Sequence, residues 1–232
     1  MPRIFAISDL HLSFSVNKPM NVFGSRWENY ENRLRENWQG VVAKDDVVLM
    51  PGDTSWATYL KDAKEDFSFI HNLNGTKLIS KGNHDYWWET LSKLNGFLED
   101  MRFDTIQFIH NTHVLLGDTV ICGTKGYPET EKEPEGEEEK KLYHRELVRL
   151  QNALKSAKET GAKRIITMLH YPPGTNTAFS KCLQESGVHT CVFGHLHGGA
   201  FSSAAQGDIL GVNYRLVSCD YLKFMPLLIS EF

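Results

Sequence analysis

The stretch VVLMPGDTSWATYLKDAKEDFSFIHNLNGTKLISKGNHD, residues 47–85, decides the fold. It holds two short apolar runs, Val47–Met50 and Lys77–Ser80, and each is followed by turn residues, which is typical of buried strands. Between them, Tyr59–Leu73 has the apolar spacing of a helix and ends at Asn74-Gly75, residues that favour the left-handed stop of a helix. A strand, a helix and a strand in this order predict a parallel βαβ unit.

The same alternation extends in both directions from this unit. Three further apolar runs have the character of buried strands: Arg3–Ser8, Arg164–Leu169 and Thr190–Phe193. Three further segments have helical spacing and stop directly before a glycine: Trp27–Gln39, Leu142–Thr160 and Thr177–Ser186. This alternation predicts a parallel sheet that is covered by helices.

Two other regions carry strands without a helix between them. They are Thr105–His110, His113–Leu116 and Thr119–Gly123 in the middle of the chain, and Tyr214–Ser218 and Phe224–Ser230 near its end. Strands that are separated only by turn residues predict hairpins. Two kinds of strand in one chain predict two packed mixed sheets with helices outside. We therefore expect an α/β protein, a four-layer α/β/β/α sandwich, that forms a single domain over residues 1–232.

The composition is that of an ordinary globular protein, and it narrows the range of functions. Of 232 residues 41% are hydrophobic, and 25 Lys and Arg against 29 Asp and Glu give a net charge of −4. Because this balance lacks the basic footprint of a protein that is held on phosphates, we expect no stable nucleic-acid binding. The N-terminus reaches Asp9 before an apolar signal core could form, and no stretch approaches the roughly 18 apolar residues of a membrane span. We expect a cytoplasmic protein with reduced cysteines and no membrane contact.

The segment Glu129–Lys141 is strongly charged. It holds seven Glu and three Lys together with Pro134 and Gly136. Such a segment cannot bury apolar surface, so we interpret it as a solvated loop that leads into the next helix. A lid over the functional site is the alternative.

Polar side chains cluster directly after the predicted strands. The clusters are Asp9-Leu10-His11, Gly52-Asp53, Gly82-Asn83-His84-Asp85, His170 and Gly194-His195-Leu196-His197. Each cluster alone has an ordinary structural explanation, such as a turn or a cap. Because ligands bind beyond the carboxyl ends of the strands in an open α/β sheet, we expect all five clusters to converge on one site.

The residue types in these clusters point to metal chemistry. Asp, Asn and His supply oxygen and imidazole ligands without a thiolate, a set that suits manganese, iron or zinc. Seven such ligands exceed the need of one ion, and a carboxylate can bridge two. We therefore expect two divalent metal ions, manganese first, with iron or zinc as alternatives. Such a pair activates a water and binds phosphoryl oxygens, so no protein nucleophile is required.

The ordered set D-x-H, G-D, G-N-H-D, a lone His and G-H-x-H resembles the calcineurin-like metallophosphoesterases, and in particular the small bacterial phosphohydrolases of that superfamily. The resemblance implies the four-layer sandwich and a hydrolase of phosphate esters, either a phosphatase or a phosphodiesterase. It also implies seven metal ligands: Asp9, His11 and His197 for one ion, Asn83, His170 and His195 for the other, and Asp53 as the bridge.

The resemblance further implies that a bridging hydroxide attacks the phosphate ester in line and that His84 protonates the leaving group. An eighth metal ligand or a structural donor is the alternative role for His84. We expect the neighbouring carboxylate of Asp85 to help orient the His84 ring.

Residues around the motifs bear on the substrate. The second motif continues Thr54-Ser55-Trp56 and lacks the Asp-Arg continuation that is typical of protein phosphatases, so we expect a small phosphorylated substrate. Lys125 and Tyr127, in a glycine-containing loop after a predicted strand, are candidate substrate contacts, with a solvated loop as the alternative.

Lys18 and Arg26 are further candidates for substrate contact, and we interpret the aromatic run Tyr86–Trp88 as part of the core. A nuclease of the same superfamily is the alternative function, although the sequence has no evident basic stripe. A scaffold that keeps the fold without catalysis is the other alternative, and the presence of every expected ligand argues against it.

Overall fold

The computed structural model describes residues 2–128 and 134–231. The strands of this part of the chain are β1 Arg3–Ala6, β2 Val47–Pro51, β3 Thr76–Ser80, β4 Ile106–Phe108, β5 His113–Leu116, β6 Thr119–Thr124, β7 Arg164–Leu169, β8 Thr190–Phe193, β9 Gly207–Ile209, β10 Val212–Leu216 and β11 Leu227–Glu231. The α-helices are α1 Tyr30–Val41, α2 Lys64–His71, α3 Leu91–Met101, α4 Glu137–Glu159 and α5 Ala178–Glu185.

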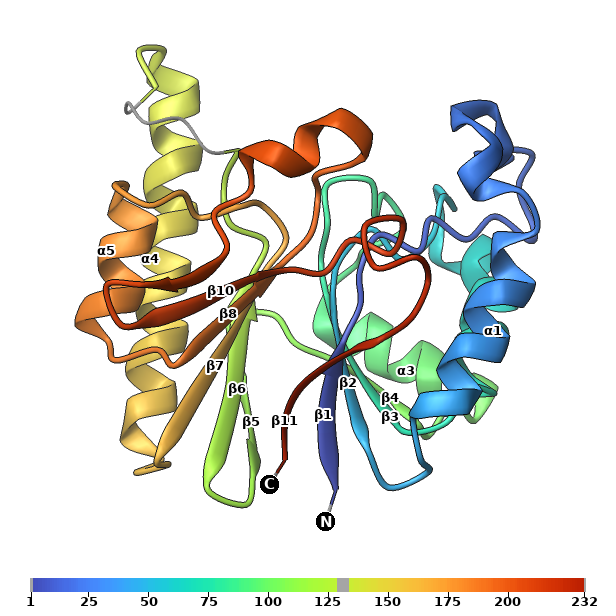
Figure 1. Cartoon of the computed structure of the whole chain (residues 1–232), viewed down its shortest axis with the longest axis horizontal. Coiled ribbons are helices and arrows are strands. Elements are labelled where there is room, and N and C mark those ends of the chain that lie inside the picture. Colours follow the sequence, from blue (N-terminus) through green and yellow to red (C-terminus); the bar gives the residue numbers. More distant parts are fainter. Residues whose placement is uncertain (1, 129–133, 232) are drawn as a thin grey trace.

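The strands form two mixed sheets. The first has the order β11-β1-β2-β3-β4, in which β1 to β4 run parallel and β11 is antiparallel to β1. The second has the order β5-β6-β7-β8-β10-β9, with a parallel centre and an antiparallel strand at each edge. Figure 1 shows the two sheets facing each other, with α1 and α3 outside the first and α4 and α5 outside the second. The predicted four-layer α/β/β/α sandwich is confirmed.

Apolar side chains fill the space between the sheets and the space under the helices on each side. In β2, Val47 and Leu49 point into the layer between the sheets, whereas Val48 and Met50 pack under the helices of the first sheet. In β7, Ile166 likewise lies between the sheets. Because both faces of the central strands are buried, these strands are largely apolar, which is the pattern on which the sequence prediction rests.

Of the predicted hairpins, the one between β5 and β6 is confirmed, and the one that joins β4 to β5 is wrong. Strand β4 pairs in parallel with β3 in the first sheet, so the break at Asn111 carries the chain from one sheet to the other. The reason is helix α3, which the sequence analysis does not predict. The Thr90 side chain accepts the backbone N–H of Lys93 at its start, and Leu94 and Leu98 are its buried residues. Strands β3 and β4 are therefore the ends of another parallel crossover.

The predicted hairpin between the last two strands is also wrong. Strand β10 is parallel to β8 in the second sheet, and β11 is antiparallel to β1 in the first. Phe224, predicted as a strand residue, lies in the turn region before β11 and is buried in the core under α1. The hairpin partner of β10 is the short strand β9. A buried strand has the same apolar pattern in either sheet, so the pattern does not specify the sheet to which it belongs.

Three helices begin elsewhere than predicted. Helix α2, predicted from Tyr59, begins at Lys64 after the 3₁₀ helix Leu60–Ala63. Helix α1 begins at Tyr30 after a 3₁₀ helix, Ser25–Trp27, and α4 begins at Glu137 rather than at Leu142. The end of the acidic segment is thus helical, and three glutamates in the first turn of α4 are favourable near the positive end of the helix dipole. Residues 129–133 of the predicted solvated loop or lid, Glu129–Lys141, lie outside the described residues. All four cysteines are free, and no helix among the described residues has the length and apolar character to cross a membrane.

Candidate metal centre

The five polar clusters meet at the edge of the sandwich where the parallel strands end. Asp9 and His11 follow β1, and Asp53 follows β2. The other candidate ligands also follow parallel strands: Asn83 after β3, His170 after β7, and His195 and His197 after β8. The structure brings all seven predicted ligands together, because the carboxyl ends of parallel strands lie at the same edge.

Asp9, His11 and His197 form one group. One potential ligand atom from each side chain lies within 4.8 Å of the others. The Nε2 atoms of His11 and His197 are 3.4 Å apart, and His197 Nε2 is 3.5 Å from Asp9 Oδ1. Two imidazole nitrogens and a carboxylate oxygen at this spacing form one face of a metal coordination shell.

Asn83, His170 and His195 form the second group, in which Asn83 Oδ1 lies 2.6 Å from His170 Nε2 and 3.0 Å from His195 Nδ1. Asp53 lies between the two groups. Its Oδ2 atom is 3.5 Å from His170 Nε2 and 3.8 Å from His11 Nε2. One carboxylate facing a histidine of each group has the geometry that a bridging ligand requires.

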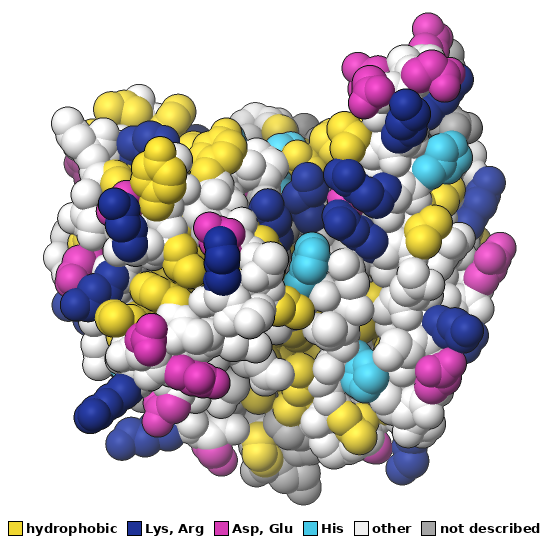
Figure 2. Space-filling model, turned by 180° about the vertical axis from the view of Figure 1, so that it is seen from behind, with side chains coloured by type: hydrophobic (Ala, Val, Ile, Leu, Met, Phe, Trp, Pro, Cys, Tyr) yellow, Lys and Arg dark blue, Asp and Glu magenta, His cyan; other side chains and the backbone are white. Residues whose placement is uncertain are grey.

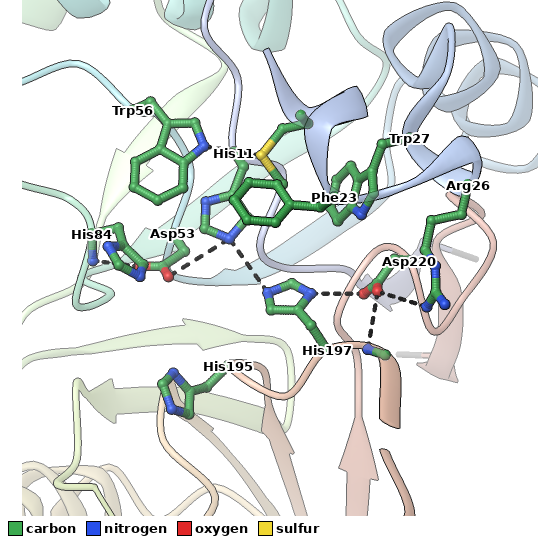
Figure 3. A pocket seen from close by; sticks show the side chains of 12 residues that line it. His11, Phe23, Arg26, Trp27, Asp53, Trp56, His84, His195, His197 and Asp220 are labelled. Carbon is green, nitrogen blue, oxygen red and sulfur yellow. Dashed lines mark hydrogen bonds and ion pairs between the residues drawn. The ribbon is translucent and has the colours of Figure 1, made fainter. Parts of the chain in front are cut away.

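Hydrogen bonds orient two of these histidines. His170 Nδ1 lies 3.0 Å from the carbonyl oxygen of Pro51, and His197 Nδ1 lies 2.9 Å from Asp220 Oδ1. When each Nδ1–H donates to its oxygen, each Nε2 lone pair is left facing the centre. Figure 3 shows the Asp220 carboxylate between His197 and Arg26, whose Nη1 is 3.5 Å from Asp220 Oδ2. The sequence analysis missed Asp220, and its position shortly after a parallel strand, β10, was the available signal.

Asp85 holds the two loops that carry Asp53 and Asn83. Its carboxylate accepts five N–H groups: those of Gly82 at 2.7 Å, Asp53 at 2.9 Å, Thr54 at 2.9 Å and Ser55 at 3.4 Å, and the indole of Trp87 at 3.1 Å. The expectation that Asp85 orients the His84 ring is therefore wrong. A short, fully buried carboxylate is satisfied by the backbone donors around it instead.

Two glycines of the motifs allow close approach to the candidate ligands. A Cβ atom on Gly82 would lie 2.1 Å from Asp53 Oδ1, and one on Gly194 would lie 2.1 Å from Asp9 Oδ2. Neither distance is tolerable for a carbon atom. The glycines of G-N-H-D and G-H-x-H are thus required by packing against the carboxylates of Asp53 and Asp9.

Four of the seven candidate ligands have left-handed backbones: Asp9, His11, Asp53 and His195 have φ angles of 58°, 48°, 52° and 71°. Residues other than glycine rarely adopt this conformation. Holding one residue in such a sparsely populated backbone conformation costs on the order of 1–3 kcal/mol of folding free energy. The surrounding fold holds these side chains in place against that cost, as is common where side chains must converge on a ligand.

Burial and hydrogen bonds shift the pKa values of the candidate ligands in different directions. Burial alone lowers the pKa of His197, but hydrogen bonds with Asp220 and Asp9 raise it to about 10. Burial, followed by the charges of Asp85 and Asp9, raises the pKa of Asp53. Burial lowers the pKa of His11 to about 3 and that of His170 to about 4, so both imidazoles are neutral near pH 7 and can offer a lone pair to a cation. The oxygen and imidazole donors present therefore fit a pair of divalent ions.

Comparison with known proteins agrees with this geometry. Residues 2–199 match the family model described as calcineurin-like phosphoesterase. The chain belongs to the calcineurin-like phosphoesterase family. It is accordingly a hydrolase that acts on phosphate esters, and the family generally uses a binuclear metal centre.

Solved structures similar to this phosphoesterase share its fold at low sequence identity. Phosphopantetheinyl hydrolase from Mycobacterium tuberculosis has a TM-score of 0.63 at 12% identity, with 98% of this chain and 95% of that chain covered. A protein from Thermus thermophilus has a TM-score of 0.55 at 16% identity, with 91% of each chain covered. A protein of unknown function from Aquifex aeolicus has a TM-score of 0.52 at 14% identity, covering 98% and 96% of the two chains. No curated protein sequence matches the chain significantly.

A cavity of about 520 Å³ opens beside the candidate metal ligands of this phosphoesterase. Figure 3 shows His84 on its wall beside Asp53 and Trp56. The His84 ring lies 4.6 Å from that of Trp56, and the backbone N–H of His84 donates to Asp53 Oδ1 at 2.8 Å. Its Nδ1 atom is buried with no hydrogen-bond partner among the described residues, and burial lowers the pKa of the ring. The ring is thus available to a molecule in the cavity.

The other predicted substrate contacts lie in different places. Arg26 lines the cavity, and the Lys18 ammonium lies 5.0 Å from the centre of the Trp56 ring. Lys125 lines a neighbouring groove, and Tyr127 packs against Tyr143 at 5.5 Å between ring centres. A substrate contact by Lys125 or Tyr127 stays a prediction.

The aromatic run is largely core, as interpreted from the sequence. Trp87 is 1% exposed and packs edge to face on Phe67, Trp88 is partly buried against the same cluster, and only Tyr86 is exposed. The remaining aromatic walls of the cavity, Phe23 and Trp27, come from the connection between β1 and α1, where the sequence analysis singled out only the basic residues.

Proposed function

We propose that this phosphoesterase hydrolyses an ester of a small phosphorylated molecule with two divalent cations, manganese first and iron or zinc as alternatives. Asp9, His11 and His197 hold one ion, Asn83, His170 and His195 hold the other, and Asp53 bridges them. The observation that carries this proposal is the position of Asp53 Oδ2, 3.8 Å and 3.5 Å from a histidine nitrogen of each group. When bound, such a pair supplies a hydroxide near neutral pH and neutralises the charge of the phosphoryl group.

The residues around the cations prepare the site for this reaction. Asp220 holds His197 in the tautomer that leaves Nε2 free, and the carbonyl of Pro51 does the same for His170. Water attacks phosphorus and releases one proton to solvent while the P–O bond to the leaving group breaks. His84, protonated from solvent, supplies the proton that the departing alkoxide takes up. The cavity next to His84 has apolar walls, Phe23, Trp27 and Trp56, which suit an organic leaving group of limited size.

Loading metal into the metal-free protein tests the proposal. We expect two ions per chain, turnover of p-nitrophenyl phosphate or its diester that depends on metal, and weaker binding of both ions in Asp53→Asn. One ion per chain, or a variant that loses only one ion, would contradict the bridging role.

A single turnover in H₂¹⁸O places ¹⁸O in the phosphoryl product if no phosphoenzyme forms, whereas oxygen from the protein in the first turnover would exclude direct attack by water.

The role of His84 is tested by His84→Ala with two leaving groups. An alkyl phosphate needs a proton and should lose about 10²- to 10⁴-fold in kcat, whereas p-nitrophenyl phosphate should lose much less. His144→Ala, which changes an exposed histidine of α4, is the matched control. An equal loss on both substrates, or a loss that follows missing metal, would place His84 among the ligands instead.

The substrate itself is open to a direct screen of metal-loaded protein against phosphomonoesters, cyclic nucleotides, nucleotide sugars and diesters. The name of the M. tuberculosis neighbour adds phosphopantetheine esters to this screen. Single-stranded DNA belongs in the same screen, because a nuclease is the alternative function. A strong preference for DNA over every small ester would favour that alternative.

A further inference from the structure

A second groove, of about 730 Å³, lies beside the metal centre and shares no lining residue with the cavity that holds His84. It is formed where β3 and β6 end, by the segment before α3, and by one side of α4. Four cationic side chains line it: Lys81, Lys125, Arg145 and Arg149. Figure 2, seen from behind, shows Lys and Arg side chains gathered near the top of the molecule, beside the acidic start of α4.

The carboxylates of this groove neutralise only part of its charge. Glu146 is buried and pairs with Arg149 at 2.6 Å, and it lies 3.9 Å from Arg145. Glu89 pairs with Lys93 at 3.1 Å, a residue outside the groove. Over residues 2–128 and 134–231, neither Lys81 nor Lys125 forms an ion pair. Two ammonium groups, each half-buried, thus remain without a carboxylate partner and face the same groove.

Other side chains of the groove lie in this positive field. His110 lies at its floor with its ring 5.8 Å from that of Trp88. Burial, and then the charges of Arg149 and Lys81, lower the pKa of His110. A neutral His110 and the uncharged Trp88 ring leave the cationic side chains as the dominant feature of the groove, so an anion is the ligand that fits.

The groove begins where the metal centre ends. Lys81 directly precedes the turn that carries Asn83. The backbone N–H of His170 donates to the carbonyl oxygen of Lys125 at 3.1 Å. Lys125 Nζ lies 5.7 Å from the centre of the Tyr171 ring, and that ring lies 4.6 Å from the ring of His195. One aromatic ring therefore separates the Lys125 ammonium from a candidate metal ligand.

We propose that this groove binds a second phosphate of the substrate, so that the preferred substrates are small molecules with a phosphate in addition to the one that is hydrolysed. The proposal rests on the hydrolase function proposed above and deepens it. A phosphate dianion matches two unpartnered ammonium groups, and Arg145 adds donors for its oxygens. The net charge of −4 and the three glutamates in the first turn of α4 disfavour a long polyanion over a small one.

A matched pair of substrates tests this inference with metal-loaded protein. n-Hexyl phosphate and 1,6-hexanediol bisphosphate have the same scissile group and chain, and only the second carries the additional phosphate. Diol bisphosphates of two to eight carbons, each with its alkyl monophosphate, vary the spacing. We expect kcat/KM to favour the bisphosphate by about tenfold or more at the best length, and this ratio to fall as salt is added, because partly exposed charges are screened.

The ratio should fall to about two, the statistical factor for two equivalent phosphate esters, in Lys125→Met and in Arg145→Met, two variants that change different elements. It should be retained in Lys155→Met, which changes an exposed lysine of α4 outside the groove. Equal kcat/KM for bisphosphate and monophosphate at every length, in protein that turns both over, would overturn the inference and leave the hydrolase function intact. Tighter binding of a short single-stranded oligonucleotide than of every bisphosphate would also overturn it.

Calorimetric titration separates the two proposals. If metal-loaded protein turns over no ester but still binds 1,6-hexanediol bisphosphate about tenfold more tightly than n-hexyl phosphate, the hydrolase function fails and the groove is supported. If it binds the two equally, the inference fails whatever the turnover.

Discussion

Replacing Asp85 by asparagine should loosen the junction between the loops that carry Asp53 and Asn83. In the folded protein one carboxylate oxygen accepts the N–H groups of Gly82 and Asp53, and the other accepts those of Thr54, Ser55 and Trp87. An asparagine keeps one oxygen and presents an NH₂ group on the other side. In either orientation at least two buried N–H groups lose their acceptor.

The magnitude follows from that count. A buried donor left without a partner costs about 1–3 kcal/mol, so the free energy of unfolding of the metal-free protein should fall by about 2–6 kcal/mol. This is a large part of the roughly 5–15 kcal/mol that is typical of a folded domain. Because Asp53 and Asn83 are displaced together, metal affinity should fall by about 10- to 100-fold, as for other partners of metal ligands.

Asp66→Asn is the matched control, since Asp66 is also fully buried. Its Oδ1 accepts the N–H of Phe14 at 2.8 Å, and its other oxygen is bonded to the Ser55 hydroxyl, which can turn to accept from an amide. Urea unfolding at pH 8 and metal titration measure both variants. If Asp85→Asn unfolds within about 1 kcal/mol of Asp66→Asn and binds metal equally well, the two-loop role of Asp85 is refuted.

Three further predictions concern pH, packing and the orientation of a ligand. Burial raises the pKa of Asp66 from 3.8 to about 6, so its contribution to stability is present below pH 4 and is lost as the pH rises through 6. Relative to Asp66→Asn, the free energy of unfolding of the wild-type protein in urea should fall by about 3 kcal/mol between pH 4 and pH 8. The same pH dependence in both proteins would contradict this. Gly82→Ala would place a Cβ 2.1 Å from Asp53 Oδ1, so this variant should lose about 1–3 kcal/mol of stability and bind metal more weakly. Gly96 lies in α3 with open space around the position of a Cβ, so Gly96→Ala should instead gain up to about 1 kcal/mol. Asp220→Asn should weaken the binding of one of the two ions by about 10- to 100-fold in a metal titration, and Arg26→Met should have a smaller effect. If Asp220→Asn binds both ions as tightly as the wild-type protein does, the orienting role of Asp220 is rejected.

The sequence by itself determined the fold class and the seven side chains that meet at the candidate metal centre. Val47–Met50 is apolar throughout and Arg164–Leu169 largely so, because both faces of a central strand are buried, and such runs alternate with amphipathic helices. Parallel strands end at one edge, so polar residues such as Asp53 and His170 that follow them converge, however far apart they lie in the sequence.

Only the tertiary structure decided which sheet each strand joins and which residues support the ligands. Strand β4 buries Ile106 and Phe108, and in β11 Leu227 and Ile229 pack partly buried against the layer between the sheets. An apolar face does not carry the identity of its partner. Asp85, Asp220 and the groove between Lys81 and Lys125 depend on distances between segments that are far apart in the sequence. A carboxylate that accepts N–H groups from another loop has no local signature, because its role is set by the donors that the packed fold places around it.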